Sequence, residues 1–268
     1  MDENIKKHLV FHFYCDDNYE QNRAIKMHLQ CLKFYSHVFD DALFCIAVQD
    51  INNKKLICDI EKNIIDCGFK NLTLKVVKNS IYREALTFYE EVVLKMKDTD
   101  GMTFFGHTKG YTNYIKLPNG ATESNIDTWI LGLYYLSLSN IEEVETYLFG
   151  QYTYKMYGSF LSYCEKNSYG QGFPLYSGTF FWINNQGLLI KENNNFPKLT
   201  DLTYAENFLS MIFNKDDFYN IGTYYGKNNF MSYIVNYYQF ANETISWFLT
   251  EAELKDFIEY KAKMINSI

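Results

Sequence analysis

The sequence predicts an α/β fold, with a mostly parallel sheet, helices on both of its faces and a less regular C-terminal third. Short apolar runs recur along the first 110 residues, and segments with apolar residues at helical spacing separate them. Parallel strands that are covered on both faces are apolar along their whole length, and crossover helices join them. The alternation stops after about residue 110, so the rest of the chain is expected to be less regular.

Four strands and three helices are expected in the first part. The strands are HLVFHFYC at 8–15, ALFCIAV at 42–48, LTLKVV at 72–77 and GMTFFG at 101–106; the helices run to about 39, over 59–67 and over about 82–97. Asp17 and Glu20 have the spacing of a capping box, which predicts that the first helix starts there. Gly68 ends the second helix.

The remaining elements are expected after a polar loop at 111–124. They are a long helix at about 125–139, strands at 154–163 and 176–183, a helix at 205–213 and an amphipathic helix near 251–265. Ser124 and Asp127 have capping-box spacing at the start of the long helix. Because no internal repeat or linker is present, we expect one domain over 1–268, with parts at about 8–110, 111–215 and 216–268.

Charge and cysteine content exclude several classes of protein. The formal net charge is −7 and the isoelectric point is about 5.3. Binding to a phosphate backbone needs a basic surface, so nucleic acid is not an expected partner. The six cysteines form no CxxC pair, which favours reduced, buried thiols. The 24 tyrosines suit a concave sugar-binding surface or the core.

The chain shows no signal for export or membrane insertion. Residues 1–7 are polar, and the first apolar run, at 9–15, is too short for the core of a signal peptide. No apolar run reaches the roughly 20 residues that span a bilayer. We therefore expect a cytoplasmic protein that associates with a membrane at most peripherally, at its inner face.

The candidate functional site follows the fourth predicted strand, at Gly106-His107-Thr108-Lys109-Gly110. In an open α/β sheet, ligands bind outside the carboxyl ends of the strands. A lysine there supplies a charge for a phosphate group, a histidine exchanges a proton, and glycines let backbone amides approach a ligand. A turn with a surface lysine and a capping histidine explains the same residues equally well.

Several short motifs occur together in a fixed order. The strings FFGHTKG, MYGSF and YSGTFFWIN, with Trp129 between the first two, resemble a family of bacterial surface-polysaccharide glycosyltransferases. These enzymes are related to rhamnan-synthesis-type proteins and carry an HTKG … W … G … SGNFWW pattern. The string HFYCDD at 12–17 is similar to the family's first strand and turn, and the resemblance extends over about 12–206. It implies a GT-A-like, Rossmann-like fold and sugar transfer from a nucleotide sugar to a surface polysaccharide or lipid-linked glycan.

The resemblance divides the chain into a nucleotide-binding half at about 8–110 and an acceptor-side half at about 111–215. His107 and Lys109 fall at the donor diphosphate. Tyr14 is a candidate for stacking on the nucleotide base, with a core aromatic equally plausible. Asp50 is a candidate base or ribose contact, although a turn residue is the better interpretation. The expected donor-side residues are Tyr14, Asp50, His107, Thr108, Lys109 and Gly110.

On the acceptor side, the resemblance places Ser177, Gly178 and Trp182 near the acceptor. Sugar stacking on Trp182 or Tyr176 is a hypothesis, and Trp182 has one face available for the core. Thr179 stands where the family has asparagine, so a hydrogen bond from that amide is not expected here. The expected acceptor-side residues are Tyr176, Ser177, Gly178, Thr179 and Trp182. Trp129 is expected in the core.

The sequence leaves the need for a metal open. The DTD triplet at 98–100 has the DxD arrangement of many metal-binding transferases, but it precedes the fourth strand. A turn at the opposite edge of the sheet is therefore the better interpretation. Asp16 and Asp17 could hold a ribose or a metal, although capping explains Asp17 better. The alternatives are manganese or magnesium, or no metal, with His107 and Lys109 replacing its charge.

An inverting transferase needs a carboxylate that accepts the proton of the acceptor hydroxyl. Glu206 is the expected base, with Asp201 in reserve, and the resembling family has an acidic residue at a similar place. Thr203 and Glu206 also have capping-box spacing, so a structural role is an equal alternative.

Two other functions fit the composition. A non-catalytic carbohydrate-binding protein would use the aromatic residues without a phosphate site at His107 and Lys109. A sugar-phosphate or nucleotidyl transferase would need acidic metal ligands at strand ends or a glycine-rich phosphate loop, and neither pattern is convincing in this sequence.

Overall fold

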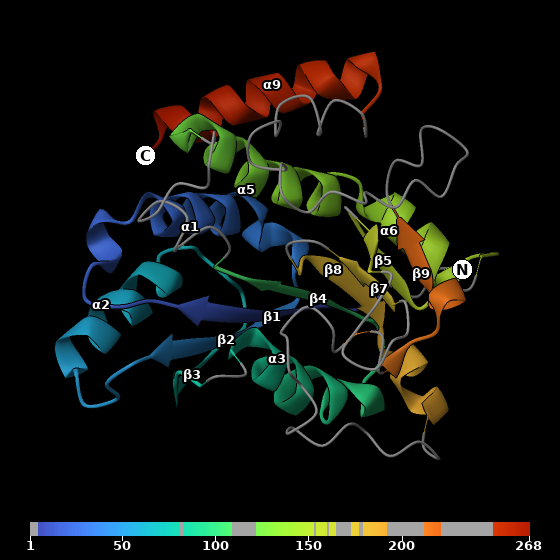
Figure 1. Ribbon diagram of the computed structural model, residues 1–268, viewed down its shortest axis with the longest axis horizontal. Coiled ribbons are helices and arrows are strands. Elements are labelled where there is room, and N and C mark those ends of the chain that lie inside the picture. Colours follow the sequence, from blue (N-terminus) through green and yellow to red (C-terminus); the bar gives the residue numbers. More distant parts are fainter. Residues whose placement is uncertain are drawn as a thin grey trace.

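A computed structural model of the chain describes residues 5–80, 83–108, 122–152, 154–159, 161–164, 173–176, 179–191, 209, 212–220 and 249–268. Its centre is a seven-stranded, mostly parallel mixed sheet with helices on both faces (Figure 1). The predicted α/β class is therefore confirmed. This architecture is compatible with a Rossmann-like fold.

The strand order in the sheet is β3-β2-β1-β4-β8-β5-β9. The strands are β1 (Lys7–Tyr14), β2 (Asp41–Val48), β3 (Leu72–Lys78), β4 (Met102–His107), β5 (Met156–Gly158), β8 (Phe181–Asn184) and β9 (Phe218–Asn220). Strands β1 to β4 are parallel, as predicted, and begin and end within one residue of the predicted bounds. Strand β8 runs antiparallel between β4 and β5. Two further strands, β6 (Leu161–Cys164) and β7 (Phe173–Tyr176), form a separate antiparallel pair.

Helices cover the two faces of the sheet unequally. The longer ones are α1 (Arg23–Tyr35), α2 (Lys54–Ile65), α5 (Glu123–Leu138), α6 (Ile141–Phe149) and α9 (Glu251–Asn266). Figure 1 shows α1, α5 and α9 on one side of the sheet and α3 (Arg83–Thr87) on the other. Helix α3 continues as a π-helix at Phe88–Val93. Short 3₁₀ turns lie at Tyr19–Gln21, Ser36–Val38, Met96–Asp98, Asn185–Lys191 and Lys215–Asp217.

Alternation along the strands creates two separate cores. In β1, Leu9, Phe11 and Phe13 belong to the cluster that includes α1, α2, α5 and α9. Val10 belongs to the smaller cluster that includes the π-helical segment after α3. Successive side chains of a strand point to opposite faces, so β1 and β4, for example, contribute to both clusters. We call the side of the sheet covered by α1, α2, α5 and α9 the apolar face, and the side covered by α3 the α3 face.

The predicted start of the first helix is wrong. Residues 19–21 form a 3₁₀ turn, and α1 begins only at Arg23, with Asn22 as its N-cap. The Asn22 side chain accepts a hydrogen bond from the Ala24 N–H at 2.9 Å. Asp17 does not cap this helix, because α1 begins six residues after it; the Asp17 carboxylate instead accepts a hydrogen bond from the Asn53 side chain.

The predicted start of the long helix is also wrong. Thr122 caps α5 and forms a capping box with Asn125, two residues earlier than the predicted pair. Asp127 is inside the helix and 2% exposed. There it accepts hydrogen bonds from the Arg23 guanidinium on both carboxylate oxygens. The carboxylate therefore joins α1 to α5 instead of capping a helix.

Several other expectations differ from the structure. The strand expected at 154–163 is divided into β5 and β6, and the one at 176–183 is divided into β7 and β8. Helix α2 starts earlier than expected, at Lys54, because Asn53 caps it. Helix α6 and strand β9 were not predicted. The helix near 251–265 is confirmed as α9, whereas most of the helix expected at 205–213 lies outside the described residues.

Candidate functional site

The carboxyl ends of β1 and β4 lie side by side at the point where the chain reverses its direction across the sheet. The chain runs from β1 through β2 to β3 and then returns past β1 to β4. Ligands of open α/β sheets bind in the crevice at such a switch point. The candidate site is therefore built from the residues that end β1 and β4, and from α3, which precedes β4. We call this end of the sheet, at Tyr14, His107 and Thr108, the crevice.

Thr108 joins the ends of these two strands. Its hydroxyl accepts a hydrogen bond from the Tyr14 N–H at 3.0 Å and donates one to the Tyr14 carbonyl at 3.1 Å. Its own N–H donates to the His12 carbonyl at 3.2 Å. Thr108 is 5% exposed. The hydroxyl of this predicted donor-side residue is thus hydrogen-bonded to the backbone of β1, and it holds the carboxyl ends of β1 and β4 together.

His107 lies next to His12 on the neighbouring strand, and both side chains face α3. The Nδ1 atom of His107 is 3.7 Å from the Glu84 carboxylate, and the Nδ1 atom of His12 is 2.8 Å from the Thr87 hydroxyl. All four residues are buried. Burial lowers the pKa of His12 to about 4, the Glu84 carboxylate opposes this change, and His107 adds to it. His12 is therefore neutral near pH 7.

These histidines belong to a line of polar residues that crosses four strands at one level. The strand register pairs His12 with His107 on one side and with Cys45 on the other, and pairs Cys45 with Lys75. We call Lys75, Cys45, His12 and His107 the polar row. Burial raises the pKa of the Cys45 thiol to about 11, and nearby Glu91 adds to this effect. The row ends at the crevice with His107.

Lys75, at the far end of the row, has carboxylate partners of its own. It donates hydrogen bonds to Glu91 at 2.6 Å and to Glu90 at 3.3 Å. The bond to Glu91 raises the pKa of Lys75, against a smaller opposing effect of burial. Glu91 is 1% exposed and also accepts a hydrogen bond from Lys95. Buried charges are stable when they are paired in this way.

Two further predicted donor-side residues lie near the crevice. Tyr14 ends β1, is half-buried, and its hydroxyl accepts a hydrogen bond from the Gln49 side chain at 3.4 Å. Asp50 follows β2, is exposed, and accepts a hydrogen bond from the Asn52 N–H at 2.9 Å. The turn interpretation of Asp50 is thus confirmed, since its carbonyl also accepts a hydrogen bond from the Asn53 N–H at 3.2 Å.

The two described acceptor-side residues differ in environment. Thr179 has a φ of +57°, which is unusual for a β-branched residue, and is 1% exposed. Among the described residues its hydroxyl has no hydrogen-bond partner. Trp182 is fully buried on the apolar face, stacks on Phe39 and donates its indole N–H to the Ser137 carbonyl at 2.8 Å. Its ring therefore has no face for sugar stacking in this structure.

Other predicted site residues lie outside the described part of the chain. They are Lys109, Gly110, Ser177, Gly178, Asp201 and Glu206. For Tyr176 only the backbone is described, and it pairs with Leu161 in the small sheet. Their predicted roles stay predictions. Trp129, expected in the core, is 1% exposed and packs there.

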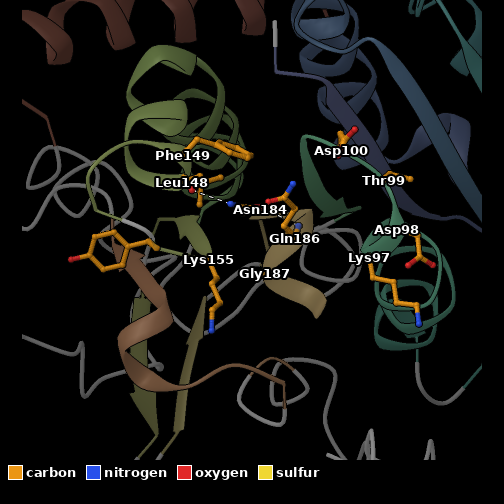
Figure 2. A pocket seen from close by; sticks show the side chains of 11 residues that line it. Lys97, Asp98, Thr99, Asp100, Leu148, Phe149, Lys155, Asn184, Gln186 and Gly187 are labelled. Carbon is orange, nitrogen blue, oxygen red and sulfur yellow. Dashed lines mark hydrogen bonds between the residues drawn. The ribbon is translucent and has the colours of Figure 1, made fainter. Parts of the chain in front are cut away.

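The DTD triplet lies at the opposite edge of the sheet from His107, as predicted. Asp98 ends a 3₁₀ turn, and the Thr99 hydroxyl donates to the Met96 carbonyl at 2.8 Å. The triplet lines a cavity of about 740 Å³ between the start of β4 and the ends of α6 and β8 (Figure 2). Lys155, on another wall, forms an ion pair with Asp217 at 2.8 Å. We place the candidate site at the crevice instead, because ligands of such sheets bind at the carboxyl ends.

Within the described residues, no group of three or more histidine, cysteine, aspartate or glutamate side chains is arranged to hold a metal ion. No helix there is both long enough and apolar enough to cross a bilayer.

The sequence analysis missed three residues of the site, namely His12, Glu84 and Thr87. The sequence contains patterns that could have identified these three residues. Glu84, Thr87 and Glu91 recur at spacings of three and four residues in an otherwise apolar segment, which places them on one helical face. His12 interrupts an apolar strand on the face opposite Phe11 and Phe13.

The fold is that of an α/β protein, and the candidate site lies at the carboxyl ends of two of its parallel strands, β1 and β4. Comparison with known proteins gives no family: no protein-family model matches the chain, and a search of curated proteins finds no match.

Proposed function

We propose that this chain is a glycosyltransferase that moves a sugar from a nucleotide-sugar donor to a surface polysaccharide or a lipid-linked glycan, on a GT-A-like fold. The observation that supports the proposal is the meeting of Tyr14, His107 and Thr108 at the switch point of a mostly parallel sheet. The strings that resemble the glycosyltransferase family include all three residues: HFYCDD contains Tyr14, and FFGHTKG contains His107 and Thr108. The combination offers an aromatic side chain for a base and an imidazole for a phosphate.

In this proposal the crevice stabilises the charge that develops on the leaving diphosphate. His107 supplies a positive charge or a proton there, and Lys109 supplies a second positive charge. Tyr14 stacks on the nucleotide base, and Thr108 fixes the turn between the two strands. Glu206, with Asp201 in reserve, accepts the proton of the acceptor hydroxyl. Ser177, Gly178 and Thr179 line the acceptor side.

A divalent cation would need hard oxygen ligands close to the diphosphate. Glu84, the carboxylate beside His107, already faces its imidazole at 3.7 Å, and Asp50 near the crevice lies in a turn. Among the described residues, no group of three or more histidine, cysteine, aspartate or glutamate side chains is arranged to hold a metal ion. This donor set does not fit manganese or magnesium well, so the proposed mechanism assigns no step to a metal. Turnover that persists in excess chelator is the expected result, and turnover that chelator abolishes and manganese restores would refute this part.

Thermal unfolding in the presence of nucleotides tests the proposal. UDP, GDP, CMP and TDP are each added with and without manganese, because a ligand that binds only the folded state stabilises it. At a concentration of 100 times Kd, the expected gain in unfolding free energy is about 2.7 kcal/mol. We expect one nucleotide to stabilise the wild type selectively, and Lys109→Ala and His107→Asn to lose most of that gain.

Lys62→Ala is the matched control, since Lys62 is an exposed lysine in the last turn of α2. It removes one positive charge without touching the crevice and should keep the full gain. Equal gains in all variants would place the nucleotide elsewhere. No gain with any nucleotide would favour the non-catalytic carbohydrate-binding alternative.

A further inference from the structure

The α3 face contains a second layer of polar residues directly behind the crevice. Glu84 and Thr87 are one turn apart on α3, and they face His107 and His12 of the sheet. After Thr87 the helix widens into a π-helix at Phe88–Val93. Such π-helical segments are rare and occur frequently at functional sites. The helix therefore presents two polar side chains to the two histidines at the end of the polar row.

Glu84 is an unusual residue to find in this position. Its side chain is 8% exposed, and glutamate is almost never buried unless it is paired. The ring nitrogen of His107 lies 3.7 Å from its carboxylate, which is an ion-pair distance but longer than a hydrogen bond. A carboxylate at this distance favours the charged form of an imidazole. Two titratable groups of the described residues thus face His107, namely Glu84 from α3 and His12 from β1.

His12, the other imidazole near Glu84, is not the one that carries a positive charge. It lies within hydrogen-bond distance of the Thr87 hydroxyl, at 2.8 Å, and it is 4% exposed. Its burial disfavours the imidazolium form, and a positive charge on His107 disfavours it further. One buried carboxylate therefore faces two imidazoles, of which His12 stays neutral and His107 is the one at the crevice.

We propose that Glu84 is the positioning residue that holds His107 in its charged form and orients it toward the diphosphate of the donor. This inference rests on the proposed function, because it assigns the charge of His107 to the leaving group. Glu84 acts through His107 and does not touch the ligand. Thr87 contacts the ring of His12 at 2.8 Å, and burial keeps this second imidazole neutral.

The first measurement needs no ligand. We follow the imidazole resonances by NMR over a pH series and assign the signal of His107 with the His107→Asn variant. Glu84→Gln keeps the size of the side chain and removes its charge. We expect the pH at which His107 titrates to fall by about one unit in this variant, since an opposite charge has been removed from its side.

Two variants complete this measurement. Glu90→Gln is the matched control, because Glu90 lies six residues along the same segment, is 43% exposed and pairs with Lys75. It should leave the titration of His107 unchanged. Glu84→Asp keeps the charge and moves it back by one methylene, so it should restore part of the change. It also serves as the test variant if Glu84→Gln does not fold.

The second measurement uses the nucleoside diphosphate that stabilises the wild type. In Glu84→Gln we expect the affinity for this nucleoside diphosphate at pH 7 to fall by up to about tenfold. This is the change in affinity that corresponds to a fall of about one unit in the pH at which His107 titrates. The pH at which binding weakens should move down together with the titration of His107. A purely structural role for Glu84 would lower thermal stability and leave that pH unchanged.

The two measurements separate this inference from the proposed function. An unchanged titration of His107 in folded Glu84→Gln overturns the inference, whatever the nucleotide result. A lowered titration in a protein that binds no nucleoside diphosphate supports Glu84 as the partner of His107 and overturns the donor site. A lowered titration together with a shifted binding profile supports both.

Discussion

The two faces of the central sheet differ in the kinds of side chain that they bury. On the apolar face, Phe11, Phe44 and Trp182 are fully buried among other aromatic rings. On the α3 face, the same strands carry the polar row at the level of their carboxyl halves. The difference shows where stability and where chemistry are concentrated. The apolar face contributes the larger apolar core, whereas the α3 face combines a smaller apolar core with buried polar groups such as His12, Glu84 and His107.

On the α3 face, the polar side chains of the strands have partners from one helical segment, 84–91. Thr87 faces His12, Glu84 faces His107, and Glu91 faces Lys75. Buried polar groups are costly unless such partners are present. Conflicts between local packing rules and observed residues are expected at functional sites. The comparison between the faces therefore leads to predictions about how each responds to substitution and to pH.

The largest effect is expected on the apolar face. Phe11→Ala should lower the free energy of unfolding by about 3–5 kcal/mol, because it removes a fully buried ring and leaves a cavity. Phe11 lies 5.6 Å from Phe44 and 6.2 Å from Phe180, measured between ring centroids. Urea denaturation at pH 7 measures the change. Ile51→Ala is the control, since Ile51 is 46% exposed and should change stability little. A loss below about 1 kcal/mol for Phe11→Ala would contradict the assigned role of this face.

The next effect concerns the α3 face and depends on pH. The pKa of His12 is lowered by burial to about 4, from an ordinary value of 6.5. The unfolded chain therefore binds a proton in this range that the folded chain does not, and stability falls as pH falls from about 6.5 to about 4. The expected contribution is about 3 kcal/mol at pH 4. Below that range both states are protonated and this contribution becomes constant.

Urea denaturation over a pH series tests this prediction. His12→Asn removes the titrating group, so its stability should fall by about 3 kcal/mol less than that of the wild type between pH 6.5 and 4. His37→Asn is the control, because His37 is exposed and its ring nitrogen contacts the Phe34 carbonyl. It should follow the wild-type profile. Equal losses in His12→Asn and wild type would show that His12 is not held neutral.

The sequence predicted the parallel half of the sheet well, for a physical reason. Strands buried on both faces must be apolar throughout, so β1 to β4 are visible as apolar runs. The position of β8 was not predictable in this way. Its direction depends on pairing with β4 and β5, which is decided by contacts far apart in the chain. Helix starts failed because several side chains near each start can serve as a cap, and tertiary contacts such as the one between Asp127 and Arg23 decide among them.

The candidate site was predicted only in part for a similar reason. His107 and Thr108 were found because they follow a strand directly. The polar row was missed because its members come from four strands and meet only when the register of all four is known. Glu84 lies on α3, and its place beside His107 depends on how this helix packs on the sheet. The segment was predicted as one helix, but it is divided into α-helical and π-helical parts.

The smallest effect concerns Thr179, which lies just before β8 at the crevice end of the sheet. Its positive φ strains a β-branched residue, and its buried hydroxyl has no partner among the residues the structure describes. Glycine adopts such a φ without strain, so Thr179→Gly should raise the free energy of unfolding by about 1 kcal/mol, because relief of strain exceeds the entropy that glycine loses on folding.

The opposite sign is expected for the same substitution in an ordinary strand. Thr73 is exposed in β3, where the backbone is regular, so Thr73→Gly should lower the free energy of unfolding by about 1 kcal/mol. Urea denaturation of the two variants side by side decides the matter. A gain at 179 and a loss at 73 would mean that the chain keeps a strained residue at the crevice at the expense of stability, as expected for a residue retained for function. Losses at both positions would mean that Thr179 is held by packing alone, and the crevice would then carry no stored strain.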